Sequence, residues 1–249
     1  MSDFDFFSAK RPSTLSTGAM IATSHPLATA AGLEVLQDGG NAVDAAIAAV
    51  SVQCVVDPLM TGIGGDCFAL YAPAGGAVKA LNGSGRATAA ASVAALTELG
   101  LSGEIPQTSP HSVTVPGAIS AWCRLHKDHG TLPLERLFMR AIGYARSGFP
   151  VTPRVAMDWK GNEKVIAGDS HAAAVFLPEG KAPVAGAVIR QPLLADRLEE
   201  IATSGATAFY EGATAEKMVA HLRSLGGLHT LEDFAAGKDG ANWVDPVSA

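Results

Sequence analysis

An alanine-rich run from Ala42 to Val55 is the feature of this 249-residue chain that most restricts its fold. Asn41 before it is a favourable N-cap, and Asp44 occupies the capping-box position, so the run is predicted to be a helix. Its side chains are small and mostly apolar, which predicts a buried helix whose neighbours approach its backbone closely. The pair Gly39-Gly40 predicts the left-handed end of another helix just before it.

Most of the remaining sequence is predicted to be helical. Apolar spacing, prolines and capping residues predict helices over 116–126, with Pro116 as the first residue, over 133–147, from Pro192, over 214–225 and from Thr230.

Strand signals are few. Residues 19–24 form one short candidate, and residues 67–72 and 77–81 flank a glycine-rich turn as a β-hairpin. The segment 238–249 reads as extended chain. A sheet of two or three strands is marginal alone, so these strands are expected to need partners from a longer protein.

These elements together predict an α+β fold. The expected organisation is an N-terminal arm over 1–17, a strand, helix and hairpin unit over 18–90, and a helical layer over 91–249.

Composition excludes several classes of protein. With 48% hydrophobic and 17% charged residues the chain should fold, and a net charge of −6 without a basic run argues against nucleic-acid binding. The three cysteines are odd in number and widely spaced, which suits a reducing compartment. The longest apolar stretch, 45–56, is too short to span a bilayer, and the first residues do not form a secretory signal. We therefore expect a cytoplasmic protein without membrane contact, or a periplasmic one if a signal was removed.

Glycine and histidine motifs give no strong catalytic signal. Gly62-Ile-Gly-Gly-Asp66 precedes a strand instead of opening a helix, so its glycines are interpreted as turn residues that allow close backbone approach, not as a phosphate loop. His126 and His129 stand near a predicted helix end, and His25 and His111 are isolated. Because a metal site needs three or four converging ligands, the histidines are interpreted as structural.

Arg86 is the candidate binding residue. It follows a glycine-rich segment directly after the hairpin, where a guanidinium could bind a carboxylate through two hydrogen bonds. The alternative is a solvated arginine or a surface ion pair. Cys54, Cys67 and Cys123 lack basic neighbours in sequence and are interpreted as core residues.

A set of motifs, spread from about Gly18 to Pro246, resembles the gamma-glutamyltranspeptidase family. The motifs occur in the family's order and read Gly39-Gly-Asn-Ala-Val-Asp-Ala-Ala46, Gly62-Ile-Gly-Gly65, Val113-Thr-Val-Pro-Gly117, Arg190-Gln-Pro-Leu-Leu-Ala-Asp-Arg-Leu198, Ala208-Phe-Tyr-Glu-Gly212 and Gly226-Gly-Leu-His-Thr-Leu-Glu-Asp233.

The resemblance implies an N-terminal nucleophile hydrolase with a four-layer αββα fold, made as one precursor that cuts itself into two subunits. The chain matches the large subunit, and the nucleophilic Thr, whose own amine acts as base, is expected beyond Ala249 on the small subunit. Thr23, Thr88 and Thr114 are not expected to replace it, so this chain alone is expected to be inactive. No metal and no organic cofactor is implied.

The resemblance also assigns a role to Arg86, which matches the arginine that binds the α-carboxylate of a γ-glutamyl donor such as glutathione. The expected reaction is cleavage of the γ-glutamyl amide through an acyl-enzyme, followed by hydrolysis or transfer to an amine. Transpeptidases typically continue Arg-Glu-Thr-Ala-Pro, whereas this chain reads Gly85-Arg-Ala-Thr-Ala-Ala90. An acylase acting on a non-glutamyl amide is therefore one alternative, and a non-catalytic assembly module is another.

Overall fold

The computed structural model describes residues 13–247, so most of the expected N-terminal arm lies outside the described residues. The described α-helices are α1 (Pro26–Gln37), α2 (Ala42–Val56), α3 (Val93–Glu98), α4 (Ala118–His129), α5 (Leu134–Ser147), α6 (Pro153–Ile166), α7 (Ser170–Phe176), α8 (Pro192–Ser204), α9 (Thr207–Tyr210), α10 (Gly212–Ser224) and α11 (Leu231–Gly237). The short 3₁₀ turns are η1 (Pro110–Ser112) and η2 (Pro178–Gly180). The strands are β1 (Cys67–Tyr71), β2 (Lys79–Gly83), β3 (Phe149–Pro150), β4 (Val188–Ile189) and β5 (Asn242–Val244).

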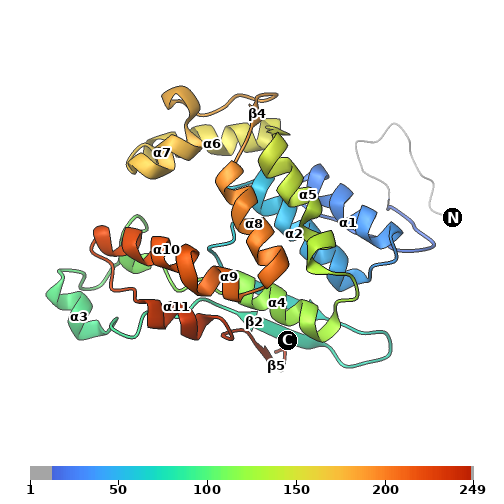
Figure 1. Cartoon of the computed structure of the whole chain (residues 1–249), viewed down its shortest axis with the longest axis horizontal. Helices are drawn as coiled ribbons and strands as arrows, with labels where there is room; N and C mark the ends of the chain where they lie inside the picture. The colour runs from blue at the N-terminus through green and yellow to red at the C-terminus, as the bar shows by residue number, and fades with distance from the viewer. Residues whose placement is uncertain (1–12, 248–249) are drawn as a thin grey trace.

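Helix α2 is the buried helix predicted from its alanines, and it lies among α1, α4 and α5 (Figure 1). Asn41 caps it by accepting hydrogen bonds from the N–H groups of Val43 and Asp44. The predicted capping box is confirmed, because the Asp44 carboxylate accepts the N–H of Asn41 at 3.0 Å.

Asp44 also ties α2 to the loop before α5. Its carboxylate is fully buried and accepts hydrogen bonds from the backbone N–H of Thr131 at 3.0 Å and from the Thr131 hydroxyl. Burial alone would raise the pKa of Asp44, but the hydrogen bonds from Thr131, Asn41 and Leu132 outweigh it and lower the pKa.

The predicted hairpin is confirmed as β1 and β2, which pair antiparallel. The extended C-terminal segment supplies a third strand, β5, which pairs antiparallel with β2 and places β2 in the centre of the sheet. Side chains alternate between the two faces of this sheet. Leu81 is buried on the face toward α4, whereas Phe68 and Leu70 on the other face are exposed.

The sheet lies along the lower side of the molecule, and most of the helices lie above it (Figure 1). One group of buried apolar side chains fills the space between the sheet and helices α1, α2, α4 and α5. A larger group joins α2, α4 and α5 to α6, α8 and α9. No helix of the described part is long and apolar enough to cross a membrane.

Two sequence predictions are wrong. Residues 19–24 form no strand, because no described strand pairs with them; residues 21–24 lie beside helix α2 instead. Pro116 is not the first residue of α4. Its carbonyl accepts a hydrogen bond from the Tyr210 hydroxyl, and Gly117 is the N-cap. The predictions for α5, α8 and α11 are confirmed, including the capping box of Thr230 and Asp233.

Candidate functional site

Arg86 lies just beyond the end of the central strand β2, on a segment held against the chain that leads into α4. Its backbone carbonyl accepts the N–H of Val115 at 2.9 Å, and the two residues form an isolated antiparallel bridge. The Arg86 residue is exposed, and no carboxylate among residues 13–247 lies within ion-pair distance of it. The surface ion pair considered from the sequence is therefore absent from the described part of the chain.

Two aspartates fix the backbone on either side of Arg86. Asp66 Oδ1 accepts the N–H of Gly85 at 2.7 Å, and Asp233 Oδ1 accepts the N–H of Ala89 at 2.8 Å. Hydrogen bonds to charged acceptors are stronger than those between neutral groups. Arg86 therefore projects from a segment whose path is set at both ends.

The segment opposite Arg86, residues 113–117, is fixed by buried side chains. His229 Nε2 donates to the carbonyl of Val113 at 2.8 Å, and the Tyr210 hydroxyl donates to the carbonyl of Pro116 at 2.6 Å. Burial raises the pKa of Tyr210 far above its usual range, so the hydroxyl keeps its proton. These contacts order the wall against which the Arg86 segment lies.

Close backbone approach at this point requires a glycine. A Cβ added to Gly117 would lie 2.2 Å from the carbonyl oxygen of Gly83, which is shorter than real contacts of a Cβ atom. The absence of a side chain at Gly117 thus allows the end of β2 to pack directly on the start of α4.

The glycine loop before β1 forms a turn, but the reason expected for its glycines is wrong. Gly62, Gly64 and Gly65 do not adopt left-handed φ angles, and a Cβ at Gly62 or Gly64 would meet open space. The carbonyl oxygen of Gly65 accepts the N–H groups of Gly117 and Ala118 at 3.0 and 2.9 Å. The loop therefore accepts hydrogen bonds from two N–H groups at the start of α4. A phosphate-binding loop would do the opposite and donate its own N–H groups to the ligand.

Arg86 lines a cavity of about 130 Å³ beside this junction. The other lining residues come from the Arg86 segment, from the start of α4 and from α11 with the loop after it: Ser84, Ala87, Ala89, Val115, Pro116, Gly117, Asp233, Ala236, Gly237 and Gly240. The lining is mostly apolar and small, with a cation and a carboxylate at its edge. A cavity of this size is too small for a large ligand, and Arg86 is the one cation among its lining residues.

The histidines considered from the sequence have structural contacts. His126 Nε2 lies 2.7 Å from the carbonyl oxygen of Leu132, and His129 stacks on Tyr71 with ring centroids 4.1 Å apart. His25 caps α1 by accepting the N–H of Leu27. His111 lies in η1, where its backbone N–H donates to the Ser109 hydroxyl at 3.3 Å.

The three cysteines are free thiols packed against the core. Burial raises the pKa of Cys54 to about 12 and that of Cys123 to about 11, and it also raises the pKa of Cys67. At neutral pH these thiols are protonated and weakly nucleophilic, as expected from the lack of basic neighbours.

One group of potential metal-binding side chains is not predictable from spacing in the sequence. Asp169, His171 and His221 come together where α7 and α10 meet the solvent. The short spacing between Asp169 and His171 was the only local signal. His221 is on a different helix, so the sequence could not place it with the other two.

Comparisons with known proteins agree with the fold and with the motifs. A family model described as Gamma-glutamyltranspeptidase matches residues 28–249. The gamma-glutamyltranspeptidase of Helicobacter pylori has a similar structure, with a TM-score of 0.88 and 31% identity, covering 95% of this chain and 68% of the other. The cephalosporin acylase of Bacillus halodurans superimposes with a TM-score of 0.86 and 38% identity over 99% of this chain and 48% of its own.

Curated relatives have several activities in their names. The glutathione hydrolase-like YwrD proenzyme of Bacillus subtilis is 38% identical over 95% of this chain, and the oxamate amidohydrolase proenzyme of Klebsiella pneumoniae is 36% identical over 90% of it. The chain spans 45% and 43% of these two relatives, which is less than half of their length. The structural neighbours share the α+β architecture of N-terminal nucleophile hydrolases. The chain belongs to the gamma-glutamyltranspeptidase family.

Proposed function

We propose that the protein cleaves a γ-glutamyl-type amide and that Arg86 binds the α-carboxylate of the substrate. One observation carries the proposal. Arg86 is exposed, lines a small cavity and has no ion-pair partner in residues 13–247. A guanidinium fork can hold both oxygens of a carboxylate, which would fix the direction of the substrate relative to the attacking group.

In the proposed reaction a threonine outside these residues attacks the amide carbonyl. The amine is released, and the acyl-enzyme then reacts with water or with a second amine. Within this chain, the contribution is positioning. Asp66 and Asp233 hold the backbone of the Arg86 segment, and Arg86 holds the substrate.

Kinetics on the complete protein test the role of Arg86. Because a charge-assisted contact contributes about 1.5–3 kcal/mol, Arg86→Ala should raise KM for a glutathione-like donor roughly 10- to 100-fold. The KM of Arg86→Lys should lie between that of the wild type and that of Arg86→Ala, since an ammonium group keeps the charge without the planar fork. Arg154→Ala is a matched control, because Arg154 is exposed and, within residues 13–247, forms its ion pair with Asp158 on its own helix.

A donor that lacks the α-carboxylate makes this test specific. Its KM should be the same for the wild type and for Arg86→Ala, because the contact that is lost does not exist for this donor. If Arg86→Ala leaves KM for the glutathione-like donor unchanged, Arg86 does not bind the substrate.

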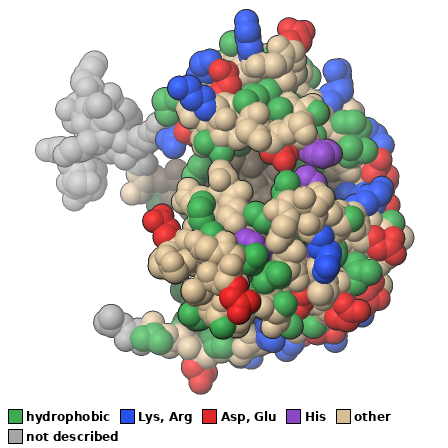
Figure 2. Space-filling model, turned by 90° about the vertical axis from the view of Figure 1, so that its left-hand side faces the viewer, with side chains coloured by type: hydrophobic (Ala, Val, Ile, Leu, Met, Phe, Trp, Pro, Cys, Tyr) green, Lys and Arg blue, Asp and Glu red, His purple; other side chains and the backbone are tan. Residues whose placement is uncertain are grey.

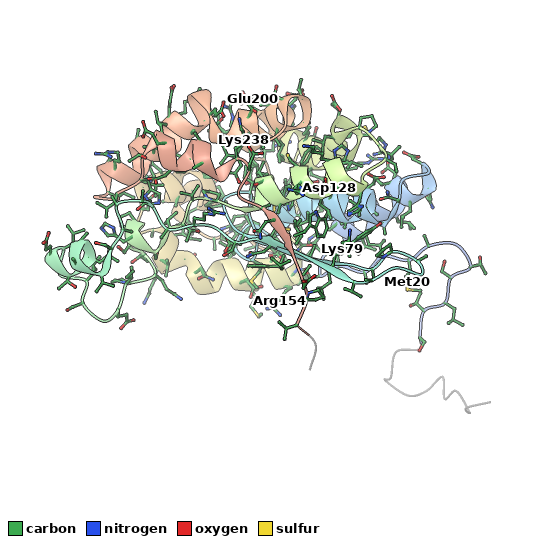
Figure 3. All side chains as sticks on the ribbon, turned by 90° about the horizontal axis from the view of Figure 1, so that it is seen from below. Met20, Lys79, Asp128, Arg154, Glu200 and Lys238 are labelled. Carbon is green, nitrogen blue, oxygen red and sulfur yellow. The ribbon has the colours of Figure 1, made fainter. Side chains whose placement is uncertain are left out.

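We propose in addition that a small subunit carrying the threonine packs on the open face of the sheet. Phe68 and Leu70 on this face are 68% and 73% exposed, and Val244 of β5 is 41% exposed. Their register places them on one side, since Leu70 pairs with Ala80 and Ala80 pairs with Val244. Figure 3 views the molecule from the side of the sheet. Apolar side chains gathered on one face favour burial against another sheet or chain.

Denaturing intact-mass spectrometry of the purified protein tests this partner. We expect a second polypeptide that begins with Thr. Phe68→Asp should reduce the amount of it that co-purifies, whereas Leu33→Asp, at an exposed apolar position of α1, should not. A fully active sample that contains a single uncleaved species would refute the proposal.

An acylase activity on a non-glutamyl amide is the second candidate. It is favoured by the residues after Arg86, which read Ala-Thr-Ala, and by relatives of similar identity named acylase and oxamate amidohydrolase. A panel of amides with and without the glutamyl head group distinguishes the two, because a γ-glutamyl enzyme should cleave only the former.

A further inference from the structure

The start of α7 and the end of α10 bring two imidazoles and a carboxylate together, away from the Arg86 cavity. Asp169 caps α7, His171 lies in its first turn, and His221 lies in the last turn of α10. One potential ligand atom of each side chain lies within 4.8 Å of the others. We infer that these three side chains bind a divalent transition-metal ion, with Zn²⁺ as the best match.

The ligand atoms are not used in other contacts of the described chain. Asp169 Oδ1 accepts the N–H of Ala172 at 2.7 Å, so Oδ2 is the oxygen left for a metal. Oδ2 lies 3.9 Å from His221 Nε2, which is too long for a hydrogen bond. Within residues 13–247 neither histidine ring donates or accepts a hydrogen bond. The two rings meet edge to face, with centroids 4.8 Å apart.

The charge of the group favours a cation. An aspartate carboxylate is ordinarily ionised at neutral pH, so Asp169 supplies a negative charge beside the two imidazoles. Neutral imidazole is the commonest metal ligand in proteins, and a carboxylate beside it completes a set of two nitrogens and one oxygen.

The geometry suits Zn²⁺ after a small movement of the side chains. Ligand bonds of about 2.0–2.1 Å in a tetrahedral site place ligand atoms roughly 3.3 Å from one another. The distance between Asp169 Oδ2 and His221 Nε2 is 3.9 Å, about 0.6 Å longer than this, and no separation within the group exceeds 4.8 Å, so none is longer by more than about 1.5 Å. The Asp169 and His221 side chains are 36% and 39% exposed, so rotation about their side-chain bonds can close the site without moving the core. Water would complete the fourth position.

A bound ion would join two parts of the fold that pack on different neighbours. Helix α7 packs on α6 and η2, whereas α10 packs on α9 and α11. Figure 2 faces the side of the molecule on which α7 and α10 lie, and it shows histidine side chains and an acidic one close together beside a hollow (Figure 2). The ion would act as a cross-link between α7 and α10.

Calorimetric titration tests the site directly. The full chain, purified without a histidine tag and stripped with a chelator, is titrated with ZnCl₂. We expect one Zn²⁺ per chain, and binding at least about 10-fold weaker for His171→Ala, for His221→Ala and for Asp169→Asn. Asp169→Asn keeps the oxygen that caps α7, so it separates ligation from helix capping. His111→Ala, which changes a histidine outside the group, is the control and should bind like the wild type.

Two further readouts distinguish a site from adventitious binding. Zn²⁺ should raise the Tm of the wild type and of His111→Ala but not that of His221→Ala, because only a native site links binding to folding. Co²⁺ should give the visible absorption of a tetrahedral complex in the wild type and in His111→Ala, but not in His171→Ala or His221→Ala. The inference is overturned if the wild type takes up no Zn²⁺, or if His171→Ala and His221→Ala bind it as tightly as the wild type does.

Discussion

Replacing Asp44 with alanine should destabilise the protein far more than the removal of a surface aspartate. Asp44 is fully buried, and it is the acceptor for the N–H groups of Asn41 and Thr131 and for the Thr131 hydroxyl. The substitution removes these three hydrogen bonds and a longer one from the N–H of Leu132 at 3.4 Å, together with the capping box of α2.

The expected loss follows from these contacts. A hydrogen bond to a charged group contributes about 1.5–3 kcal/mol when its donor is buried. Thr131 is exposed and Asn41 only half-buried, so water can replace part of each bond, and about 1 kcal/mol for each is the appropriate scale. The three together give about 3 kcal/mol, which for a chain of this length corresponds to a fall in Tm of roughly 6–12 °C.

Urea unfolding followed by circular dichroism measures this loss. Asp196→Ala is the matched control, since Asp196 also lies on a helix but is 44% exposed and pairs with Arg146 at the surface. Its removal should cost less than about 1 kcal/mol. If Asp44→Ala and Asp196→Ala lose the same free energy of unfolding, the buried hydrogen bonds of Asp44 do not stabilise the fold as argued.

The pH dependence gives a second check on Asp44. Its pKa is lower in the folded protein than the ordinary value of 3.8, so its contribution is fully present above that value. The contribution is lost as the pH falls through the lowered pKa of the folded state. The difference in unfolding free energy between the wild type and Asp44→Asn should therefore be largest near neutral pH and should shrink at the acidic end.

Two more predictions test packing and burial. Gly117→Ala should destabilise the protein in the same unfolding assay, because the new Cβ would overlap the carbonyl oxygen of Gly83. Gly143→Ala should instead stabilise it by about 0.5–1 kcal/mol, because Gly143 lies in α5 with open space around it. Burial raises the pKa of Cys54 to about 12, so this thiol should resist alkylation at pH 8 in the folded protein and react fully in urea. Mass spectrometry measures both reactions, and rapid modification of the folded protein would contradict the burial argument.

Local signals in the sequence were sufficient for the helices and the hairpin. Asn41 with Asp44, and Thr230 with Asp233, form the capping boxes that their spacing predicts, because the contacts of a capping box join residues only three apart. The end of α5 at Gly148 and the start of α8 at Pro192 are also predictable from local sequence, because glycine and proline change the backbone conformation directly beside them.

Contacts between distant residues set the limit of prediction. Residues 19–24 have the composition of a strand, but a strand needs a neighbour, and the sequence does not show where neighbours are. For the candidate site, the family motifs pointed to Arg86, whereas the hydrogen bonds of Asp66 and Asp233 to its segment needed the structure. The group of Asp169, His171 and His221 was missed for the same physical reason.

The position of β5 in the sheet has a consequence for synthesis. β1 and β2 leave the ribosome well before β5, which pairs with the free edge of β2 among the described strands. Until then one edge of β2 has unpaired N–H and C=O groups, which can pair with another chain. β5 can pair with β2 only after the helices between them have folded and brought the two strands together. Closing such a long stretch of chain is entropically costly and slow. The newly made hairpin therefore depends on early packing of α4 against it, and a chaperone that covers exposed strands would act most usefully in this interval.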